Sequence, residues 1–556
     1  MARSEELAVT CRVWVGRPGM RALLQAWPWV VLLVLLSICL VHGLWVIRGL
    51  GNYTAMLDTY RDAGFVQGFI DGNLSGDPSI EGAKRYYPPL LHALAAVVAS
   101  IAHMQPLQLL VSAAPWVNLL IPTTFFLMVR RLIDAPAAAI ATVLLVCFDG
   151  TFLPPWMAAS YSPWHSVPAI TQALFFCCVW MISARAERGR FGDAILIGSM
   201  IGIVFLAHTV PAVLLAVITA AAAVAMQGMR MRTVAWVGTA ALTTTLWTLP
   251  FLIPLVTTYH LKILNAAGAF TDDLFDPTRI PKRVIAAVLP GLGALALLGW
   301  NYWRARQFGR SVAPSTVVIL GVWIALPALF IARHFACGVG GTSTVCTAFV
   351  VPVHHWMFYI QSALACVFGY AIVSGLAPPG SAAAANPAAA SFATVVAASG
   401  AFALACAVLA FRPADQTMRE RALDMRSRVD LELYQWVLTS TQPNALFVTD
   451  ISTNAVHDSA AIAVLAAARR SVALPFTYSN PYIDWQTRKQ REEAYLAAAL
   501  SGKDSGTLCH LLAEAGDGKR VYVALATGTD APSGQVQPVF RSKQNNVYSV
   551  MPSVCR

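Results

Sequence analysis

The chain has 556 residues, of which 57% are hydrophobic and only 12% are charged, and its formal net charge is +11. A soluble domain cannot bury that much apolar surface, so the composition excludes an ordinary globular protein and predicts a polytopic α-helical membrane protein. The positive charge does not indicate a nucleic-acid partner, because most lysines and arginines stand in short loops between apolar segments, where they set membrane orientation.

Residues 1–27 are predicted to form a cytoplasmic N-terminal segment. They are polar for too long to be a cleavable signal, and the apolar run that follows lacks a small-residue cleavage site. Several arginines precede that run, which favours a cytoplasmic N-terminus. We therefore expect residues 28–47 to be a retained first membrane helix and residues 49–87 to be the first external loop.

A transmembrane domain is predicted over residues 28–411. Basic loops at 183–190, 226–232 and 301–310 indicate the cytoplasmic side. The arginine pair at 130–131 also has a cytoplasmic character, but the number of apolar segments before it does not fit that side. We therefore predict eleven to thirteen helices and not a single number. After the first helix, the candidate segments are 88–104, 107–129, 137–152, 165–183, 193–208, 210–226, 234–256, 284–303, 313–332, 356–376 and 391–411.

Beyond residue 411 the composition becomes that of a soluble domain. Residues 412–556 are predicted to form a small extracytoplasmic α/β domain, within the usual size range of domains. The pattern indicates a buried strand at 445–450, a helix at 459–470 and a second strand at 519–527. This region contains no glycine-rich phosphate loop.

Two pairs of cysteines lie outside the apolar runs. Cys337 and Cys346 flank a loop of glycine, serine and threonine, and Cys509 and Cys555 fall in the polar C-terminal region. Either pair can form a lasting disulfide only on the oxidising side of the membrane. The sequence leaves open whether they do.

Two neighbouring stretches carry a family resemblance. The first is LDTYRDAGFVQGFIDGN, beginning at Leu57, and the second is RYYPPLLHALAA, beginning at Arg85. An early aspartate in the first external loop and a Tyr-Pro-Pro-Leu entry into the next helix resemble the GT-C class of glycosyltransferases that use polyprenyl-phosphate sugars. The two stretches are most similar to the arabinofuranosyltransferases of actinobacterial cell walls. The segment NPYIDWQTRKQREEAYL, at 480–496, is similar to part of the soluble domain that ends those enzymes.

Asp58 is the candidate catalytic residue. A transfer from a lipid phosphate needs a base for the acceptor hydroxyl, and a carboxylate at the membrane surface suits that task. If the stretch is helical, Asp58 and Asp62 lie on one face with Arg61 beside them, and two neighbouring carboxylates tend to raise one pKa. From the residues alone, helix capping or pairing with Arg61 or Arg48 would explain Asp58 as well. The resemblance favours the base.

The predicted substrate-binding residues are aromatic, acidic or cationic side chains near the predicted external surface. Cations and imidazoles there would stabilise a leaving phosphate, and aromatic rings beside polar groups would stack on a sugar. Ordinary membrane roles remain alternatives: tyrosines and tryptophans of the interfacial belt, basic side chains reaching lipid headgroups, and a histidine bonded to a carbonyl. The candidates are Asp62, Tyr87, Asp149, Trp164, His165, His208, Lys262, Arg333, His354 and His355.

In the C-terminal domain, Trp485 and Arg488 are weaker candidates for binding the acceptor. An exposed tryptophan beside an arginine suits a glycan. Packing and surface roles explain the same two residues equally well, and the sequence does not decide between these interpretations.

The resulting hypothesis is a multi-pass plasma-membrane glycosyltransferase. It would move a sugar, arabinofuranose by the resemblance, from a polyprenyl-phosphate donor to a glycan, glycolipid or protein acceptor of the cell envelope. Membrane lipids are further expected partners. The resemblance allows a divalent cation as a cofactor. The sequence shows no clear set of metal ligands for it. The alternatives are a transporter or flippase of lipid-linked or envelope precursors, for which no internal repeat is visible, and a non-catalytic scaffold or sensor.

Overall fold

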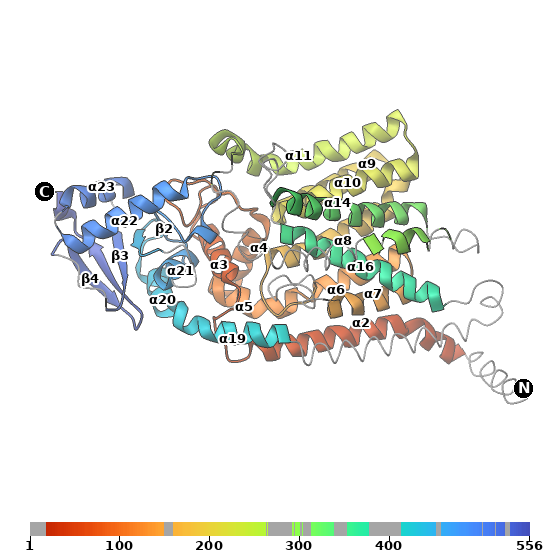
Figure 1. Ribbon diagram of the computed structural model, residues 1–556, viewed down its shortest axis with the longest axis horizontal. Coiled ribbons are helices and arrows are strands. Elements are labelled where there is room, and N and C mark those ends of the chain that lie inside the picture. The colour runs from red at the N-terminus through yellow and green to blue at the C-terminus, as the bar shows by residue number, and fades with distance from the viewer. Residues whose placement is uncertain are drawn as a thin grey trace, which may run out of the picture.

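The protein is elongated, with a bundle of helices at one end and a small sheet domain at the other (Figure 1). The N-terminal helix runs along the edge of the bundle, and the C-terminus lies at the far end of the sheet domain. The computed structural model describes residues 18–148, 160–262, 264, 292–293, 295–300, 303, 313–338, 353–376, 413–451, 458–502, 504–516, 519–528 and 534–555.

Apolar helices make up the bundle. Within the described ranges, seven spans are long and apolar enough to cross a membrane, one of which (Pro106–Leu132) is formed by two consecutive helices, and three more apolar helices are shorter. The predicted α-helical membrane fold is thereby confirmed. The total of eleven to thirteen helices stays a prediction, because 391–411 and part of 284–303 lie outside the described residues. The helices are α2 (Pro18–Ile47), α4 (Leu90–Ala102), α5 (Pro106–Val117), α6 (Leu120–Leu132), α7 (Ala135–Phe148), α8 (Val167–Arg185), α9 (Phe191–Ala207), α10 (Thr209–Gln227), α11 (Met231–Tyr259), α14 (Pro314–Gly338) and α16 (Val353–Leu376).

Large side chains fill the interior of the bundle, and apolar side chains also cover its outside. Phe175 of α8 packs its ring edge-on against Trp323 of α14 and lies 4.9 Å from the ring of Tyr359 of α16. On the outside, Leu33 is 62% exposed and Ile101 is 76% exposed. Apolar surface on both sides of a helix is what a membrane span requires, so the protein is an integral membrane protein.

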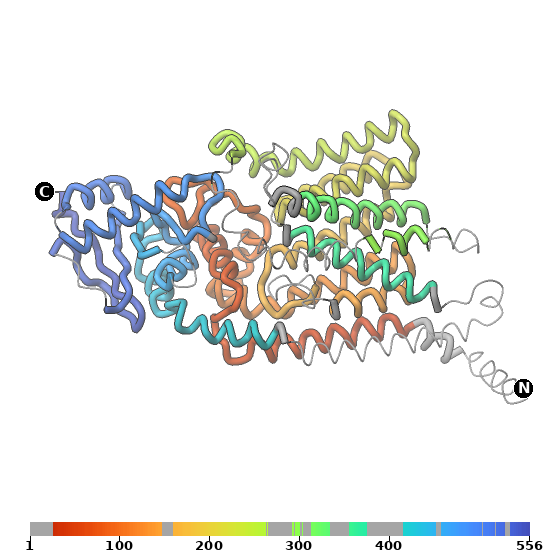
Figure 2. Tube along the Cα trace, in the orientation of Figure 1, coloured from red at the N-terminus to blue at the C-terminus, as the bar shows by residue number. Residues whose placement is uncertain are grey.

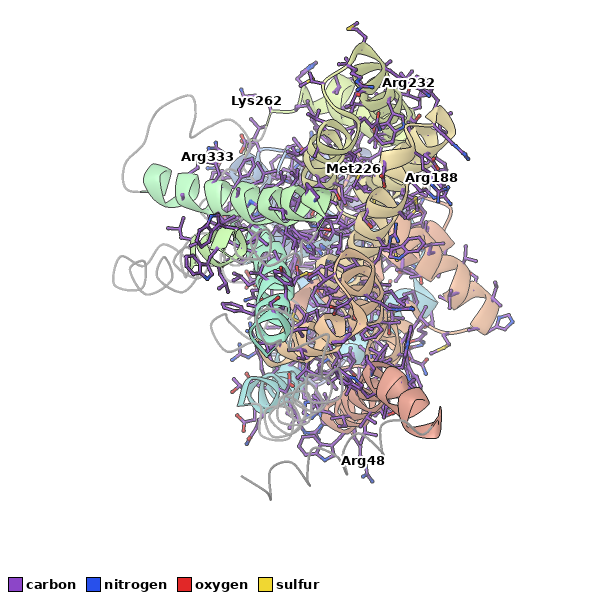
Figure 3. All side chains as sticks on the ribbon, turned by 90° about the vertical axis from the view of Figure 1, so that its right-hand side faces the viewer. Arg48, Arg188, Met226, Arg232, Lys262 and Arg333 are labelled. Carbon is purple, nitrogen blue, oxygen red and sulfur yellow. A yellow bond between two sulfur atoms is a disulfide. The ribbon has the colours of Figure 1, made fainter. Side chains whose placement is uncertain are left out.

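At one end of the bundle, two polar turns meet. The short helix η2 (Ala186–Arg188) follows α8, and Gln227 at the end of α10 donates a hydrogen bond from Nε2 to the carbonyl of Ala186 at 2.6 Å. Figure 3, viewed from the end remote from the sheet, shows Arg188, Met226 and Arg232 gathered on one side of the molecule. Two of the loops that the sequence assigns to the cytoplasmic side therefore lie together.

The C-terminal region contains a five-stranded sheet in the order β2-β1-β3-β5-β4. Strand β1 is parallel to β2 and β3, whereas β5 is antiparallel to β3 and β4. The predicted strands at 445–450 and 519–527 are confirmed, and the predicted helix at 459–470 ends earlier, at Ala466. The elements are α19 (Pro413–Arg428), α20 (Leu431–Ser440), β1 (Leu446–Thr449), α21 (Ser459–Ala466), β2 (Arg470–Ser471), η4 (Phe476–Tyr478), α22 (Trp485–Ser501), α23 (Ser505–Ala515), β3 (Val521–Ala526), β4 (Val536–Arg541), β5 (Asn545–Val550) and η5 (Pro552–Cys555).

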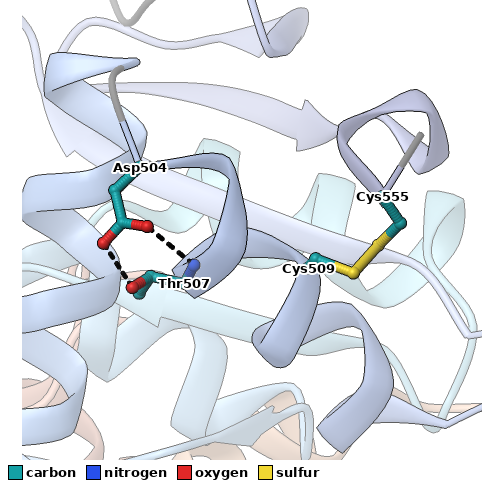
Figure 4. Close-up of a disulfide and its surroundings, with 4 residues drawn as sticks. All are labelled: Asp504, Thr507, Cys509 and Cys555. Atoms are coloured by element: carbon teal, nitrogen blue, oxygen red, sulfur yellow. Dashed lines mark hydrogen bonds between the residues drawn. A yellow bond between two sulfur atoms is a disulfide. The ribbon is translucent and has the colours of Figure 1, made fainter.

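A disulfide fastens the C-terminal end of the chain to this domain. Cys509 of α23 is bonded to Cys555 of η5 (Figure 4). Helix α23 begins at a cap in which Asp504 accepts hydrogen bonds from both the backbone N–H and the hydroxyl of Thr507. Of the two cysteine pairs considered from the sequence, Cys509 and Cys555 therefore form a disulfide. Cys346 lies outside the described residues, so its pairing with Cys337 stays open.

Helix α3 (Leu57–Ile70) lies between the bundle and the sheet domain, as the chain trace shows (Figure 2). The loop that follows α3 joins the edge of the sheet at β2: Ser471 donates from its N–H to Ser79 at 2.8 Å, and Glu81 donates back to Ser471 at 3.0 Å. Pairing of this kind covers an edge strand that would otherwise remain open. The first loop and the C-terminal domain therefore form one packed unit.

Gly64 sets how closely α3 approaches α21. A Cβ at this position would overlap the carbonyl oxygen of Leu465. We expect Gly64→Ala to separate the two helices and to cost about 1–3 kcal/mol of stability, the usual range for overpacking. A thermal unfolding midpoint measures this, with Gly192→Ala as the matched control, since a Cβ on that helical glycine meets nothing within 4 Å. Equal midpoints for the two variants would contradict the tight contact.

Candidate functional site

A cluster of charged and aromatic side chains surrounds the first turns of α3; we call it the carboxylate cluster. Asp58 lies in the first turn of the helix, where a negative charge interacts favourably with the helix dipole. Arg61 lies 3.2 Å from Asp58 and 2.9 Å from Asp62, so both carboxylates share one guanidinium. The cluster consists of Asp58, Arg61, Asp62, Tyr87, His92 and His165.

Asp62 is the buried anion of the cluster, with an exposed fraction of 1%. Its Oδ1 accepts from the Arg61 guanidinium and lies 3.2 Å from Nε2 of His92, and its Oδ2 lies 3.4 Å from Nε2 of His165. Burial by itself would raise the pKa of Asp62, but the Arg61 cation and the two imidazoles outweigh it and hold the pKa well below its usual value. Asp62 therefore stays ionised and is engaged from three directions.

Asp58 has the opposite environment. Its side chain is 48% exposed, so water reaches the carboxylate, and among the described residues it forms an ion pair with Arg61. Although one side of the carboxyl is open, the protein packed around it desolvates the charged form, and this raises the pKa of Asp58. The Asp62 charge raises the pKa further, and Arg61 only partly offsets the two effects. An accessible carboxylate with a raised pKa is suited to accept a proton from a bound hydroxyl.

Three other segments complete the cluster. His92 comes from the first turn of α4, directly after the Tyr-Pro-Pro-Leu stretch, and Tyr87 lies under the Arg61 guanidinium at 4.5 Å. His165 comes from the segment that precedes α8. That segment is held by Asn118, whose Nδ2 donates to the carbonyls of Ser162 at 2.6 Å and Trp164 at 2.9 Å.

The structure thus brings together four residues proposed from the sequence, Asp58, Asp62, Tyr87 and His165, and Trp164 lies buried beside them in the same segment. The sequence reasoning missed His92. A histidine in an otherwise apolar helix is costly at membrane depth, and that cost is the signal that would have singled it out.

Tyr478 is a second residue that the sequence reasoning missed. It lies in η4 of the C-terminal domain, is 2% exposed, and packs in a cluster that includes Leu57, the neighbour of Asp58. Burial raises the pKa of its hydroxyl, and the Asp58 charge raises it further, which places the phenol within electrostatic reach of that carboxylate. Within the described part of the chain, the hydroxyl has no hydrogen-bond partner.

A second group of candidates lies in the bundle. His208 has an extended backbone conformation between α9 and α10. The centroid of its ring lies 4.6 Å from the ring centroid of His355 in α16. Lys262 is exposed just beyond α11, and Arg333 is partly buried in α14 (Figure 3). Asp149 and the side chain of His354 lie outside the described residues. The structure therefore pairs two histidines proposed as phosphate contacts.

Trp485 and Arg488 are used in packing and in hydrogen bonds to backbone carbonyls. Trp485 is buried, not exposed as an acceptor platform requires, and its Nε1 donates to the carbonyl of Leu474 at 2.8 Å. Arg488 donates to the carbonyls of Glu81 at 3.0 Å and Val472 at 3.1 Å, which fastens the first loop to the domain. The structure supports the packing interpretation of these two residues.

No metal ligand set appears in the part of the chain that the structure describes: no group of three or more His, Cys, Asp or Glu side chains is placed to hold an ion. The cation nearest both carboxylates is the Arg61 guanidinium. Arg61 therefore supplies positive charge beside both carboxylates.

A helical membrane bundle, an acidic first loop and a C-terminal sheet domain packed on that loop together define a fold similar to GT-C membrane glycosyltransferases. No family model and no curated protein matches the chain. Among solved structures, it is similar to ArnT from Cupriavidus metallidurans bound to undecaprenyl phosphate, with a TM-score of 0.55 and 12% identity over 95% of this chain and 98% of that one. The apo state of the same protein has a TM-score of 0.51 at 14% identity, covering 95% and 99% of the two chains. The Archaeoglobus fulgidus oligosaccharyltransferase has a TM-score of 0.47 at 13% identity, covering 90% of this chain and 70% of that one.

Proposed function

We propose that the protein is a membrane glycosyltransferase that moves a sugar from a polyprenyl-phosphate donor to an acceptor of the cell envelope. The observation that carries this proposal is the contrast between two carboxylates sharing one arginine. Asp62 is buried and held ionised, whereas Asp58 is open to water with a raised pKa. Environments that separate the pKa values of paired acids are typical of sites for proton transfer.

The proposed reaction is a single displacement. The acceptor hydroxyl attacks the anomeric carbon of the donor while Asp58 takes its proton. A new glycosidic C–O bond forms as the bond to the phosphate oxygen breaks, and the polyprenyl phosphate leaves with that electron pair. Arg61, beside Asp58 and Asp62, would supply positive charge, and His165, beside Asp62, would supply a hydrogen-bond donor. The His208–His355 pair is a second candidate for contacting the phosphate.

The sidedness and the sugar are also part of the proposal. The Cys509–Cys555 disulfide supports an oxidising, extracytoplasmic compartment for the C-terminal domain. Since α3 packs against that domain, the carboxylate cluster would face the same side. Arabinofuranose is proposed as the donor sugar from the resemblance of the first loop to arabinofuranosyltransferases, and the acceptor would be a glycan, glycolipid or protein.

A donor panel tests the function directly. Purified protein in nanodiscs is given synthetic polyprenyl-phosphate arabinofuranose, mannose or glucose together with envelope extract, and release of free polyprenyl phosphate is measured. The proposal predicts release with one donor that requires both the acceptor and Asp58. Release with none of them, or release that Asp58→Asn leaves unchanged, would contradict a transferase.

The pH dependence of transfer follows from the pKa of Asp58. Only the ionised base accepts a proton, so we expect kcat/KM to fall as the pH is lowered through a pKa above the usual aspartate value. Asp62→Asn removes a repelling charge and leaves Arg61 to Asp58 alone, and both changes lower the pKa of Asp58. The acidic limb of the pH profile should therefore move to lower pH in Asp62→Asn. An unmoved limb would show that Asp58 is not the titrating base.

Tyr478 is predicted to act on the substrate side of Asp58. Its buried hydroxyl has no partner among the described residues, so a bound sugar or phosphate is a candidate partner. Tyr478→Phe removes only that oxygen, and we expect kcat/KM to fall by about 2- to 13-fold, the equivalent of one neutral hydrogen bond. Steady-state kinetics measure this. A structural role alone would lower the thermal midpoint and leave the kinetic constants of the folded protein unchanged.

A further inference from the structure

A groove lies on the outside of the bundle between α6 and α8. It has a volume of about 570 Å³ and is lined by Thr124, Leu127, Arg130, Arg131, Cys177, Trp180 and Met181. No acidic side chain lines it. An apolar wall with two guanidinium groups at its rim combines the features that a lipid tail and its anionic headgroup require.

The groove is remote from the carboxylate cluster. Asn118, just before α6, bonds the segment that carries His165, and α8 begins directly after that segment. At a rise of about 1.5 Å per residue, Arg130 and Trp180 lie roughly 18–20 Å further along their helices. The groove is therefore near the end where α8 meets the basic turn containing Arg188, the side that the sequence assigns to the cytoplasm.

The two arginines are available to an anion. Both are exposed, and within the described residues neither has an ion-pair partner; the Arg130 guanidinium stacks over Trp29 of α2 at 4.8 Å. Favourable interaction with the C-terminal end of α6 explains why arginines stand there, but it does not require an apolar groove beside them. Guanidinium groups bind phosphate oxygens in a bidentate manner, and a tryptophan at the interface packs against a lipid headgroup region.

We infer that this groove binds an anionic phospholipid of the cytoplasmic leaflet. The phosphate would lie between Arg130 and Arg131 at the level of Trp180, and an acyl chain would run from there along Leu127 and Cys177. Basic pockets between membrane helices on the cytoplasmic side recognise lipid headgroups in this way. The inference is independent of the proposed transferase activity, because it uses other residues at the other end of the bundle.

Lipid retention tests the site. Wild-type protein and the double variant Arg130→Gln/Arg131→Gln are purified from nanodiscs of phosphatidylcholine and phosphatidylglycerol, and the lipid that stays bound is counted by native mass spectrometry. We expect the double variant to retain at least fivefold less phosphatidylglycerol. Arg188→Gln/Arg190→Gln is the matched control, since it removes two exposed charges from the same end outside the groove, and it should retain the wild-type amount.

Two further arms distinguish the alternatives. Cys177→Phe fills the groove without changing its charge and should also lower retention, whereas an excess of inorganic phosphate should not displace the lipid. Equal loss in the control variant would show that general surface charge is responsible, and unchanged retention in both groove variants would overturn the site. Polyprenyl phosphate binding should not depend on Arg130 or Arg131; if it does, the groove belongs to the donor lipid and the inference is wrong.

Discussion

Asp58→Asn is expected to lower the rate of sugar transfer by about 10²- to 10⁴-fold, the usual contribution of a positioned general base. The amide has nearly the same shape as the carboxylate but cannot accept the proton of the acceptor hydroxyl. Because the side chain is 48% exposed and Arg61 keeps Asp62 as its partner, the fold should be unaffected. Single-turnover transfer from a labelled donor measures the rate, and donor binding should change little.

Asp62→Asn is the matched comparison for that variant. It makes the same chemical change one helical turn away, but at a carboxylate that is 1% exposed and holds Arg61, His92 and His165. Removing one partner of a buried ion pair leaves the other charge uncompensated, so this variant should lose thermal stability as well as activity. A wild-type rate in Asp58→Asn would place the base elsewhere, and a loss of stability in Asp58→Asn equal to that in Asp62→Asn would give the two residues the same structural role.

The membrane fold could be predicted from the sequence because each apolar run identifies a membrane helix by its own hydropathy, independently of what that helix packs against. The strands at 446–449 and 521–526 were also predictable, since continuous apolar runs bounded by polar sequence indicate buried strands. Within the site, the spacing of Asp58 and Asp62 correctly predicted that both would lie beside Arg61.

The remainder of the site depends on long-range packing that local pattern cannot supply. His92 and His165 are separated along the chain from Asp62, and they meet it only because α4 and the segment before α8 converge on α3. The same limit applies to Trp485, for which neighbouring polar residues favour exposure although the side chain is buried and donates a hydrogen bond to the carbonyl of Leu474. The proximity of Tyr478 to Asp58 could not be predicted for a related reason, since it requires the C-terminal domain to be docked on α3.

Arg469→Ala is expected to have the largest effect on that docking, about 3–5 kcal/mol, as for other buried ion pairs that lose one partner. Arg469 is 2% exposed and pairs through Nη1 with Asp71, the C-cap of α3, at 2.9 Å. It also donates from Nη1 to the carbonyl of Ala467 at 2.8 Å and from Nε to the hydroxyl of Thr441 at 3.0 Å. Truncation would leave Asp71 without its cation and, among the described residues, with only the hydrogen bond from Gln67. It would also remove the donor to Ala467 and Thr441 at the junction of three segments.

Arg470→Ala is the control for that prediction, because it removes the neighbouring arginine from a more accessible pair. Arg470 is 28% exposed and lies 3.0 Å from Glu81, and Lys519 remains 3.8 Å from the same carboxylate after its removal. We expect at most about 1 kcal/mol from this change. Thermal midpoints and hydrogen exchange of the α3 amides measure both variants, and Arg469→Ala should accelerate exchange in α3 and slow transfer, because α3 carries Asp58. Similar exchange in the two variants would mean that α3 is held by the bundle alone and that the C-terminal domain does not position the site.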